Sequence, residues 1–106
     1  MCIDVLTLFP EMILQSVGHS MLKRAQDKGL LTVRVHNIRD YTMDRHKVAD
    51  DVPYGGGAGM VLKPEPIFAA VESLGPDRGR TILLSPAGRR LDQELVRELA
   101  AEPRIT

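Results

Sequence analysis

Apolar and polar residues follow strand-like patterns in two segments near the N-terminus. Residues 2–9 form a short apolar run rich in strand-forming side chains, which predicts a buried strand that ends before Pro10. Residues 30–38 alternate apolar and polar positions, as expected for a strand with one solvated face near the edge of a sheet. Because a helical segment separates them, the pattern indicates a β-α-β unit and hence a parallel sheet.

Helical spacing dominates the segment between these two strands. Pro10 and Glu11 have the character of a first helical turn, because proline is tolerated there and an acid complements the helix dipole. The spacing is interrupted around Gly18, and we expect Ser20 to cap a second short helix that ends at Gly29.

The second half of the chain continues this alternation of elements. The pattern predicts a helix over residues 64–74, a third strand over 80–84, a turn over 85–88, and a helix capped by Asp92 with a buried stripe of Leu95, Val96 and Leu99. Residues 104–106 have the pattern of the beginning of a fourth strand. Because the sequence ends there, we expect it to be the N-terminal portion of a longer α/β protein.

Residues 39–63 show no periodicity, and a connection of about 25 residues is more often functional or disordered than a simple loop. Within it, residues 50–60 (DDVPYGGGAGM) contain four of the nine glycines. A flexible linker is the alternative explanation. Since Pro53, Tyr54 and Met60 would stiffen and anchor such a segment, we interpret it as a loop whose backbone approaches a ligand.

Composition limits the classes of function. The 106 residues fit one domain or part of one, and the formal net charge of zero means that any attraction for phosphate must be local. The single cysteine, Cys2, excludes an internal disulfide. Without a signal peptide or an apolar run of membrane-spanning length, the sequence predicts a cytoplasmic protein with no membrane partner.

The unusual residues concentrate in the loops after the second and third predicted strands. Ligands of open parallel sheets bind beyond the carboxyl ends of the strands, so we expect residues 54–59 and 84–88 to line one pocket. The glycine-rich loop is not a P-loop, because no lysine and hydroxyl follow the glycines. Nor does it join a first strand tightly to a helix, as a dinucleotide fingerprint would.

Charged residues in these loops are candidates for chemistry. Asp50 and Asp51 could bind a metal or act as bases, although neighbouring loop acids are more often solvated or turn-forming. Two basic clusters could contact phosphate, although exposed basic side chains are also ordinary surface. They are Asp44-Arg45-His46-Lys47 and Arg89-Arg90.

Five segments, in order and spacing, resemble the bacterial tRNA (guanine-N1)-methyltransferase family. They are Leu8-Phe9-Pro10-Glu11-Met12, Arg39-Asp40-Tyr41-Thr42, Asp44-Arg45-His46-Lys47, residues 50–60, and Leu84-Ser85-Pro86-Ala87-Gly88-Arg89. The Asp-Asp-x-Pro-Tyr-Gly-Gly-Gly stretch is the most specific of them. Ala58 stands where the family has proline, and Ala87 where it has glutamine.

This resemblance implies a SPOUT-type α/β methyltransferase with a trefoil knot, a homodimer that transfers a methyl group from S-adenosylmethionine to N1 of the guanosine 3′ of the tRNA anticodon. Residues 1–106 would be the N-terminal part of the knotted domain, truncated before the knot is completed, with the C-terminal tRNA-binding domain absent. Magnesium is a further candidate cofactor.

Site roles follow from the same match, residue by residue. The resemblance implies a catalytic role for Asp50, with the principal general base beyond residue 106. Cofactor contacts are implied for Leu84, Ser85, Pro86, Gly88 and Gly59, and substrate contacts for Tyr54, Gly55, Gly56, Gly57, Arg45, His46, Lys47 and Arg89. We therefore expect the isolated chain to bind the cofactor poorly and to methylate nothing measurable. An RNA-docking module and a dimerisation module are the alternatives.

Overall fold

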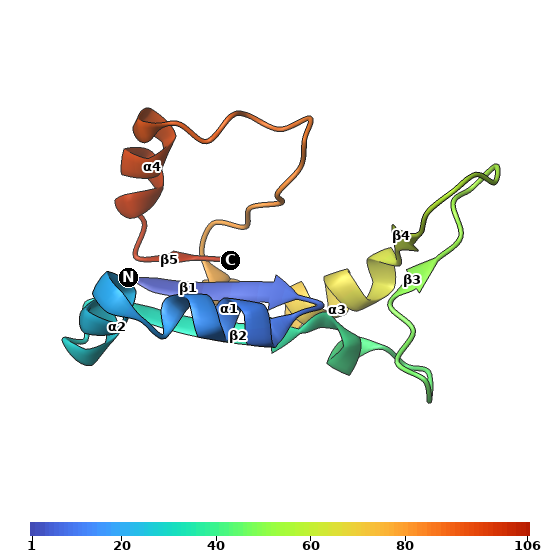
Figure 1. Ribbon diagram of the computed structural model, residues 1–106, viewed down its shortest axis with the longest axis horizontal. Coiled ribbons are helices and arrows are strands. Elements are labelled where there is room, and N and C mark those ends of the chain that lie inside the picture. The colour runs from blue at the N-terminus through green and yellow to red at the C-terminus, as the bar shows by residue number, and fades with distance from the viewer.

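A three-stranded parallel sheet lies at the centre of the computed structural model, which describes residues 1–106 (Figure 1). The strands run in the order β2 (Thr32–Asn37), β1 (Cys2–Thr7) and β5 (Arg104–Ile105). Cys2 lies opposite Thr32 on one side and opposite Arg104 on the other. The parallel α/β class, the first strand, the edge position of the second and the strand at residue 104 are thus confirmed.

A buried carboxylate joins all three strands. Asp4 on β1 is 1% exposed, and its oxygens lie 2.8 Å from Arg34 Nη2 and 2.8 Å from His36 Nε2 on β2, and 3.0 Å from Arg104 Nε on β5. Burial alone would raise the pKa of Asp4, but the hydrogen bonds from these three side chains outweigh it and lower the pKa from 3.8 to about 2. Asp4 is therefore ionised in the folded protein above that pH.

Two short helices connect β1 to β2. Thr7 Oγ1 accepts a hydrogen bond from the backbone of Phe9 at 3.1 Å where β1 ends. Helix α1 (Pro10–Val17) then begins and packs against β2, followed by α2 (Ser20–Asp27). The predicted cap was wrong, because His19 is the N-cap of α2 and the Ser20 hydroxyl accepts no backbone N–H of this helix.

The segment between β2 and the next helix is more ordered than its sequence suggested. It contains the 3-10 helix η1 (Ile38–Tyr41) and an antiparallel hairpin of β3 (Asp50–Asp51) and β4 (Val61–Leu62), which projects from the domain (Figure 1). These two strands were not predicted, because strands of two residues are too short to produce an alternating pattern. Buried Ala49 anchors the base of the hairpin, where its carbonyl accepts the N–H of Lys63 at 2.9 Å.

Helix α3 (Pro64–Ser73) confirms the third predicted helix and ends before the 3-10 helix η2 (Pro76–Arg78). It packs against η1 and β1, with Ala70 fully buried, and the hydroxyl groups of Ser73 and Tyr41 lie 3.2 Å apart.

The predicted third strand was wrong. Only Arg80 forms a ladder contact, with Ile105, and the N–H of Ile82 binds the carbonyl of Thr106 at 2.7 Å. Strand β5 has only two residues and gives the following chain no partner, so Leu83 and Leu84 are 82% and 90% exposed. The predicted turn is present, because the N–H of Gly88 binds the carbonyl of Ser85 at 3.1 Å.

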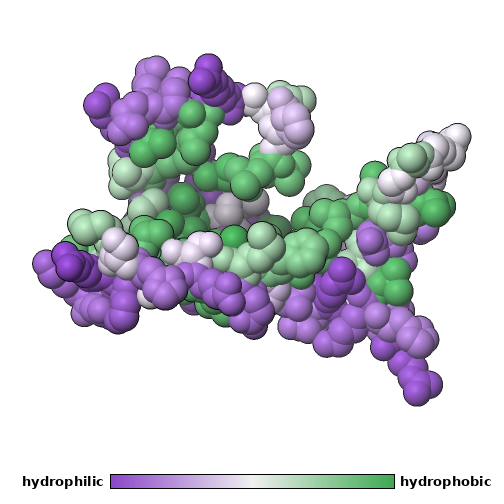
Figure 2. Space-filling model, in the orientation of Figure 1, coloured by the Kyte–Doolittle hydropathy of each residue, from purple (hydrophilic) through white to green (hydrophobic).

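Helix α4 (Gln93–Ala100) begins as predicted, with the Asp92 side chain accepting the N–H of Leu95 at 2.9 Å. Its apolar stripe is not buried: Val96 is 39% exposed, and Leu95 and Leu99 are only partly covered. Figure 2 shows this helix and its loop standing off from the sheet, with apolar surface facing the space between them.

The domain is open. Five of its 106 residues are buried, and its radius of gyration of 15.7 Å exceeds the value of about 13 Å expected for a compact domain of this length. The longest helix, α3, has 10 residues, and none has the length and apolar character of a membrane-crossing helix.

Candidate functional site

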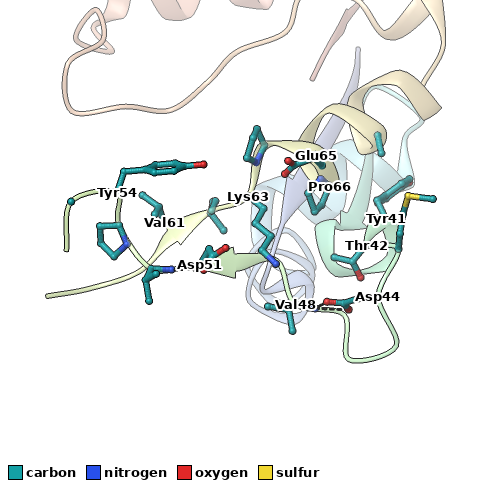
Figure 3. A pocket seen from close by; sticks show the side chains of 17 residues that line it. Tyr41, Thr42, Asp44, Val48, Asp51, Tyr54, Val61, Lys63, Glu65 and Pro66 are labelled. Atoms are coloured by element: carbon teal, nitrogen blue, oxygen red, sulfur yellow. Dashed lines mark hydrogen bonds between the residues drawn. The ribbon is translucent and has the colours of Figure 1, made fainter. Parts of the chain in front are cut away.

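One hollow of about 890 Å³ lies between the hairpin, the segment after η1 and the start of α3 (Figure 3). Tyr41 and Thr42 line one wall, and Asp51 and Val61 on the hairpin stem line another. Lys63 points into the space between them (Figure 3). The volume of this hollow is within the range typical of small-ligand sites.

The glycine-rich tip of the hairpin is held by its own backbone. The N–H of Gly56 binds the carbonyl of Pro53 at 3.1 Å, and the four glycines at 55, 56, 57 and 59 have φ values of 84°, 78°, 115° and 100°. Apart from the adjacent residues, no atom of the chain lies within 4 Å of a Cβ added at any of them, and Tyr54 is fully exposed. These glycines are therefore required by the backbone conformation and serve no packing within the chain.

The two neighbouring aspartates differ in position. Asp50 is partly buried, lies opposite Leu62 in the hairpin, and does not line the hollow. Asp51 does line it and accepts the N–H of Val52 at 2.8 Å. The resemblance assigned the catalytic role to Asp50, whereas the aspartate that lines the hollow is Asp51.

The first basic cluster is partly neutralised within the chain. Lys47 has a φ of 52°, and its ammonium lies 2.8 Å from the carboxylate of Asp40. The Asp44 carboxylate accepts the N–H of Val48 at 3.0 Å and so shapes the loop. Arg45 and His46 are exposed and form no ion pair, which leaves their side chains open to a ligand.

A second hollow, of about 910 Å³, is formed by residues 80–91 and the inner side of α4. It contains four of the predicted cofactor residues, Leu84, Ser85, Pro86 and Gly88, together with Arg89. The backbone groups of Leu83 and Leu84 make no hydrogen bond within the chain. The hollow thus offers both apolar side chains and unpaired backbone groups.

Glu98 on α4 binds two arginines of this segment. Its carboxylate accepts hydrogen bonds from Arg80 and, at 3.2 Å, from Nη1 of Arg89. The hydrogen bond from Arg80 lowers the pKa of Glu98, with a further contribution from Arg89, and Glu98 in turn raises the pKa of Arg80.

The two predicted loops do not share a pocket in this structure. The two hollows have no lining residue in common, and Gly59 lines neither. Figures 1 and 2 show why: the hairpin and the α4 arm are separate projections with open space between them. Sequence reasoning also missed that Lys63 lines the first hollow and that Glu98 binds two arginines beside the second. In the sequence, each is only a charged residue beside or within a predicted helix.

Fold and loops together define an α/β domain in which the connections beyond a parallel sheet carry ligand-sized hollows. The family model of the tRNA (Guanine-1)-methyltransferase TrmD matches residues 1–106. The chain belongs to this family.

Comparisons with individual proteins agree with this family membership. The chain is 53% identical over 105 residues to the tRNA (guanine-N(1)-)-methyltransferase of Carboxydothermus hydrogenoformans, covering 99% of this chain. It is 53% identical over 98 residues to that of Dictyoglomus turgidum, covering 92% of this chain. The crystal structure of the tRNA (m1G37) methyltransferase from Aquifex aeolicus matches 99% of this chain with a TM-score of 0.88 and 36% identity.

The chain spans less than half of these proteins: 42% of the Carboxydothermus relative, 40% of the Dictyoglomus relative and 48% of the Aquifex chain.

Proposed function

We propose that this chain supplies the cofactor loop and the glycine-rich hairpin of an enzyme that methylates N1 of the guanosine 3′ of the tRNA anticodon, with S-adenosylmethionine as methyl donor. The observation that carries the proposal is that the family match runs through both exposed loops, residues 50–60 and 84–89. These residues contribute little to the chain's own packing. An external ligand is the physical reason for keeping them.

The second hollow fits the methyl donor. Exposed Leu84 and the partly covered side chains of α4 offer apolar surface for a purine. The unpaired backbone around residues 83–84 and the turn of Ser85, Pro86 and Gly88 can hydrogen-bond the polar parts. We also infer that Gly59 comes close to this cofactor in the working enzyme. When bound, S-adenosylmethionine supplies an electrophilic methyl group on a sulfonium.

The hairpin and the basic cluster are proposed to hold the RNA. Residues 55–57 allow close backbone approach, and the exposed ring of Tyr54 is suited to stacking on a base. Arg45 and His46 are free to contact phosphate, whereas Lys47 and Arg89 must share their charge with Asp40 and Glu98. The target base must leave its stack to reach such a pocket.

Alignment supplies much of the rate in this reaction. The N1–methyl bond forms as the sulfur–methyl bond breaks, and the N1 proton passes to a carboxylate. Asp50 is the candidate carboxylate beside the guanine in this chain. We expect the principal base to come from outside residues 1–106, delivered by a second subunit of a homodimer.

Two further inferences accompany this function. As the N-terminal part of a knotted methyltransferase domain, the chain would act in the cytoplasm, where its tRNA substrate is found. No three His, Cys, Asp or Glu side chains gather at one place in this chain, and no step of the proposal passes through magnesium.

Methyl transfer to two tRNA transcripts would test the proposal. The full-length protein should methylate a transcript with guanosine 3′ of the anticodon and leave a matched transcript with adenosine there unmodified, with mass spectrometry locating the methyl group on N1. Absence of methylation, or methylation elsewhere, would contradict it.

Calorimetry on the 106-residue chain tests whether cofactor binding needs segments outside residues 1–106. We expect the chain to bind S-adenosylmethionine poorly, and micromolar affinity would contradict the need for further segments. RNA binding that follows ionic strength and ignores the cofactor would indicate the RNA-docking alternative. Oligomerisation without either ligand would indicate the dimerisation alternative.

A further inference from the structure

We propose that Glu98 is a positioning residue that holds the turn of residues 85–88 in place by binding an arginine on each side of it. This inference rests on the proposed function, because it assigns that turn to the cofactor.

The turn has no other anchor. Within residues 83–91 the hydrogen bonds are local: the N–H groups of Gly88 and Ala87 bind the backbone and the hydroxyl of Ser85. The bond from Arg89 to Glu98 is the single hydrogen bond that joins this segment to the rest of the chain. Apolar packing does not replace it, because Leu83, Leu84 and Leu91 are all largely exposed.

The geometry of the carboxylate suits this role. Arg80 lies where the segment leaves β5, and Arg89 lies just after the turn. Glu98 receives Arg80 on Oε1 and Arg89 on Oε2, so one side chain of α4 ties both ends of the segment to the same helix. Asp92 fixes the start of that helix by capping it.

Electrostatics agree with the geometry. The pKa of Glu98 is lowered by the hydrogen bond from Arg80 and then by Arg89, which keeps the carboxylate charged. All three side chains are 41–54% exposed, so water screens the pairs and each is weak. A weak restraint matters here because no other hydrogen bond ties the turn to the rest of the chain. We expect its loss to weaken cofactor binding about fivefold, or ~1 kcal/mol.

Two matched substitutions in the full-length protein test the role. Glu98→Gln removes the charge, whereas Glu94→Gln makes the same change on the same helix at a residue that forms no ion pair. Methyl order parameters of Leu83, Leu84 and Leu91, measured by NMR without any ligand, should fall in Glu98→Gln and not in Glu94→Gln. The KM for S-adenosylmethionine should rise about fivefold with kcat unchanged.

A double-mutant cycle completes the test. Arg89→Gln should weaken cofactor binding, and adding Glu98→Gln should then cause a smaller loss than Glu98→Gln alone, because the pair between residues 89 and 98 is already broken and only the pair with Arg80 is left to lose. Additive losses, or order parameters that do not change in Glu98→Gln, would overturn the positioning role. If the wild-type protein bound no S-adenosylmethionine, the proposed function would fail, while the ligand-free order parameters would still decide what Glu98 does.

Discussion

Two carboxylates of this domain each bind more than one cation, and they lie in opposite surroundings. Asp4 is buried at the centre of the sheet and binds Arg34, His36 and Arg104 from two neighbouring strands. Glu98 is exposed on α4 and binds Arg80 and Arg89 from one loop. The buried group must be paired for the sheet to exist, whereas the exposed one can only bias the position of a loop. Similar chemistry therefore serves stability in one place and preorganisation in the other.

Removing the buried carboxylate should have the largest effect. Asp4→Ala leaves Arg34, His36 and Arg104 without their shared partner, and we expect a loss of about 3 kcal/mol in the free energy of unfolding, measured by urea denaturation. Asp27→Ala, which removes an exposed partner of Lys23, is the control and should lose less than ~1 kcal/mol. Equal losses in the two variants would show that burial is not what distinguishes Asp4.

A methyl group at Gly79 should disturb both carboxylate clusters. The added Cβ would lie 2.0 Å from the carbonyl oxygen of Arg104. The backbone at residue 104 would therefore have to move away from the segment that contains Gly79 and Arg80. We expect Gly79→Ala to destabilise the protein by about 2–3 kcal/mol in thermal or urea unfolding.

Gly75→Ala is the matched control, because Gly75 has nearly the same φ, 74° against 76°, and open space at the Cβ position. It should show only the backbone strain that both substitutions share, of about 1–3 kcal/mol, and should therefore destabilise the protein less than Gly79→Ala does. If both variants were equally destabilised, the close contact between residue 79 and β5 would not contribute to the loss of stability.

Acid should weaken the sheet through Asp4. Its pKa is about 2 in the folded protein against 3.8 ordinarily, so its contribution to stability is fully present above pH 4 and is lost as the pH falls towards 2. This loss is about 2 kcal/mol, read from urea unfolding midpoints across that range. Asp4→Asn should lack this part of the pH dependence. A slope as steep in the variant as in the wild type would assign it to other carboxylates.

Salt should act on the exposed cluster with the smallest effect. At about 1 M NaCl the screening length falls to about 3 Å, so the exposed ion pairs of Glu98 weaken. The methyl order parameters of Leu84 and Leu91 should decrease, while those of Ile3 and Val5 in β1 remain constant. A parallel decrease in β1 would mean that salt acts on the whole domain.

Sequence reasoning succeeded where a pattern extended over enough residues. Strand β1, helix α3 and the Asp92 cap have local signals, and the family resemblance rested on contiguous motifs. It failed at residues 80–84, whose apolar run resembles a strand but finds only the two-residue β5 beside it. It also failed for the hairpin, whose strands are too short to alternate.

Pairings across the chain were beyond the sequence. No local sequence pattern indicates that Asp4 binds Arg104, or that Glu98 binds Arg80 and Arg89. The expectation of one pocket formed by residues 54–59 and 84–88 depended on how two projections lie in space, and each projection has its own hollow here.

The position of β1 between β2 and β5 has a consequence for synthesis on the ribosome. Asp4 can meet Arg34 and His36 as soon as the first 36 residues have emerged, but Arg104 is made 100 residues after it. One side of the first strand therefore stays unpaired until residues 104 and 105 have been synthesised. Asp4 gains its third partner, Arg104, only when β5 pairs with β1 in the observed register.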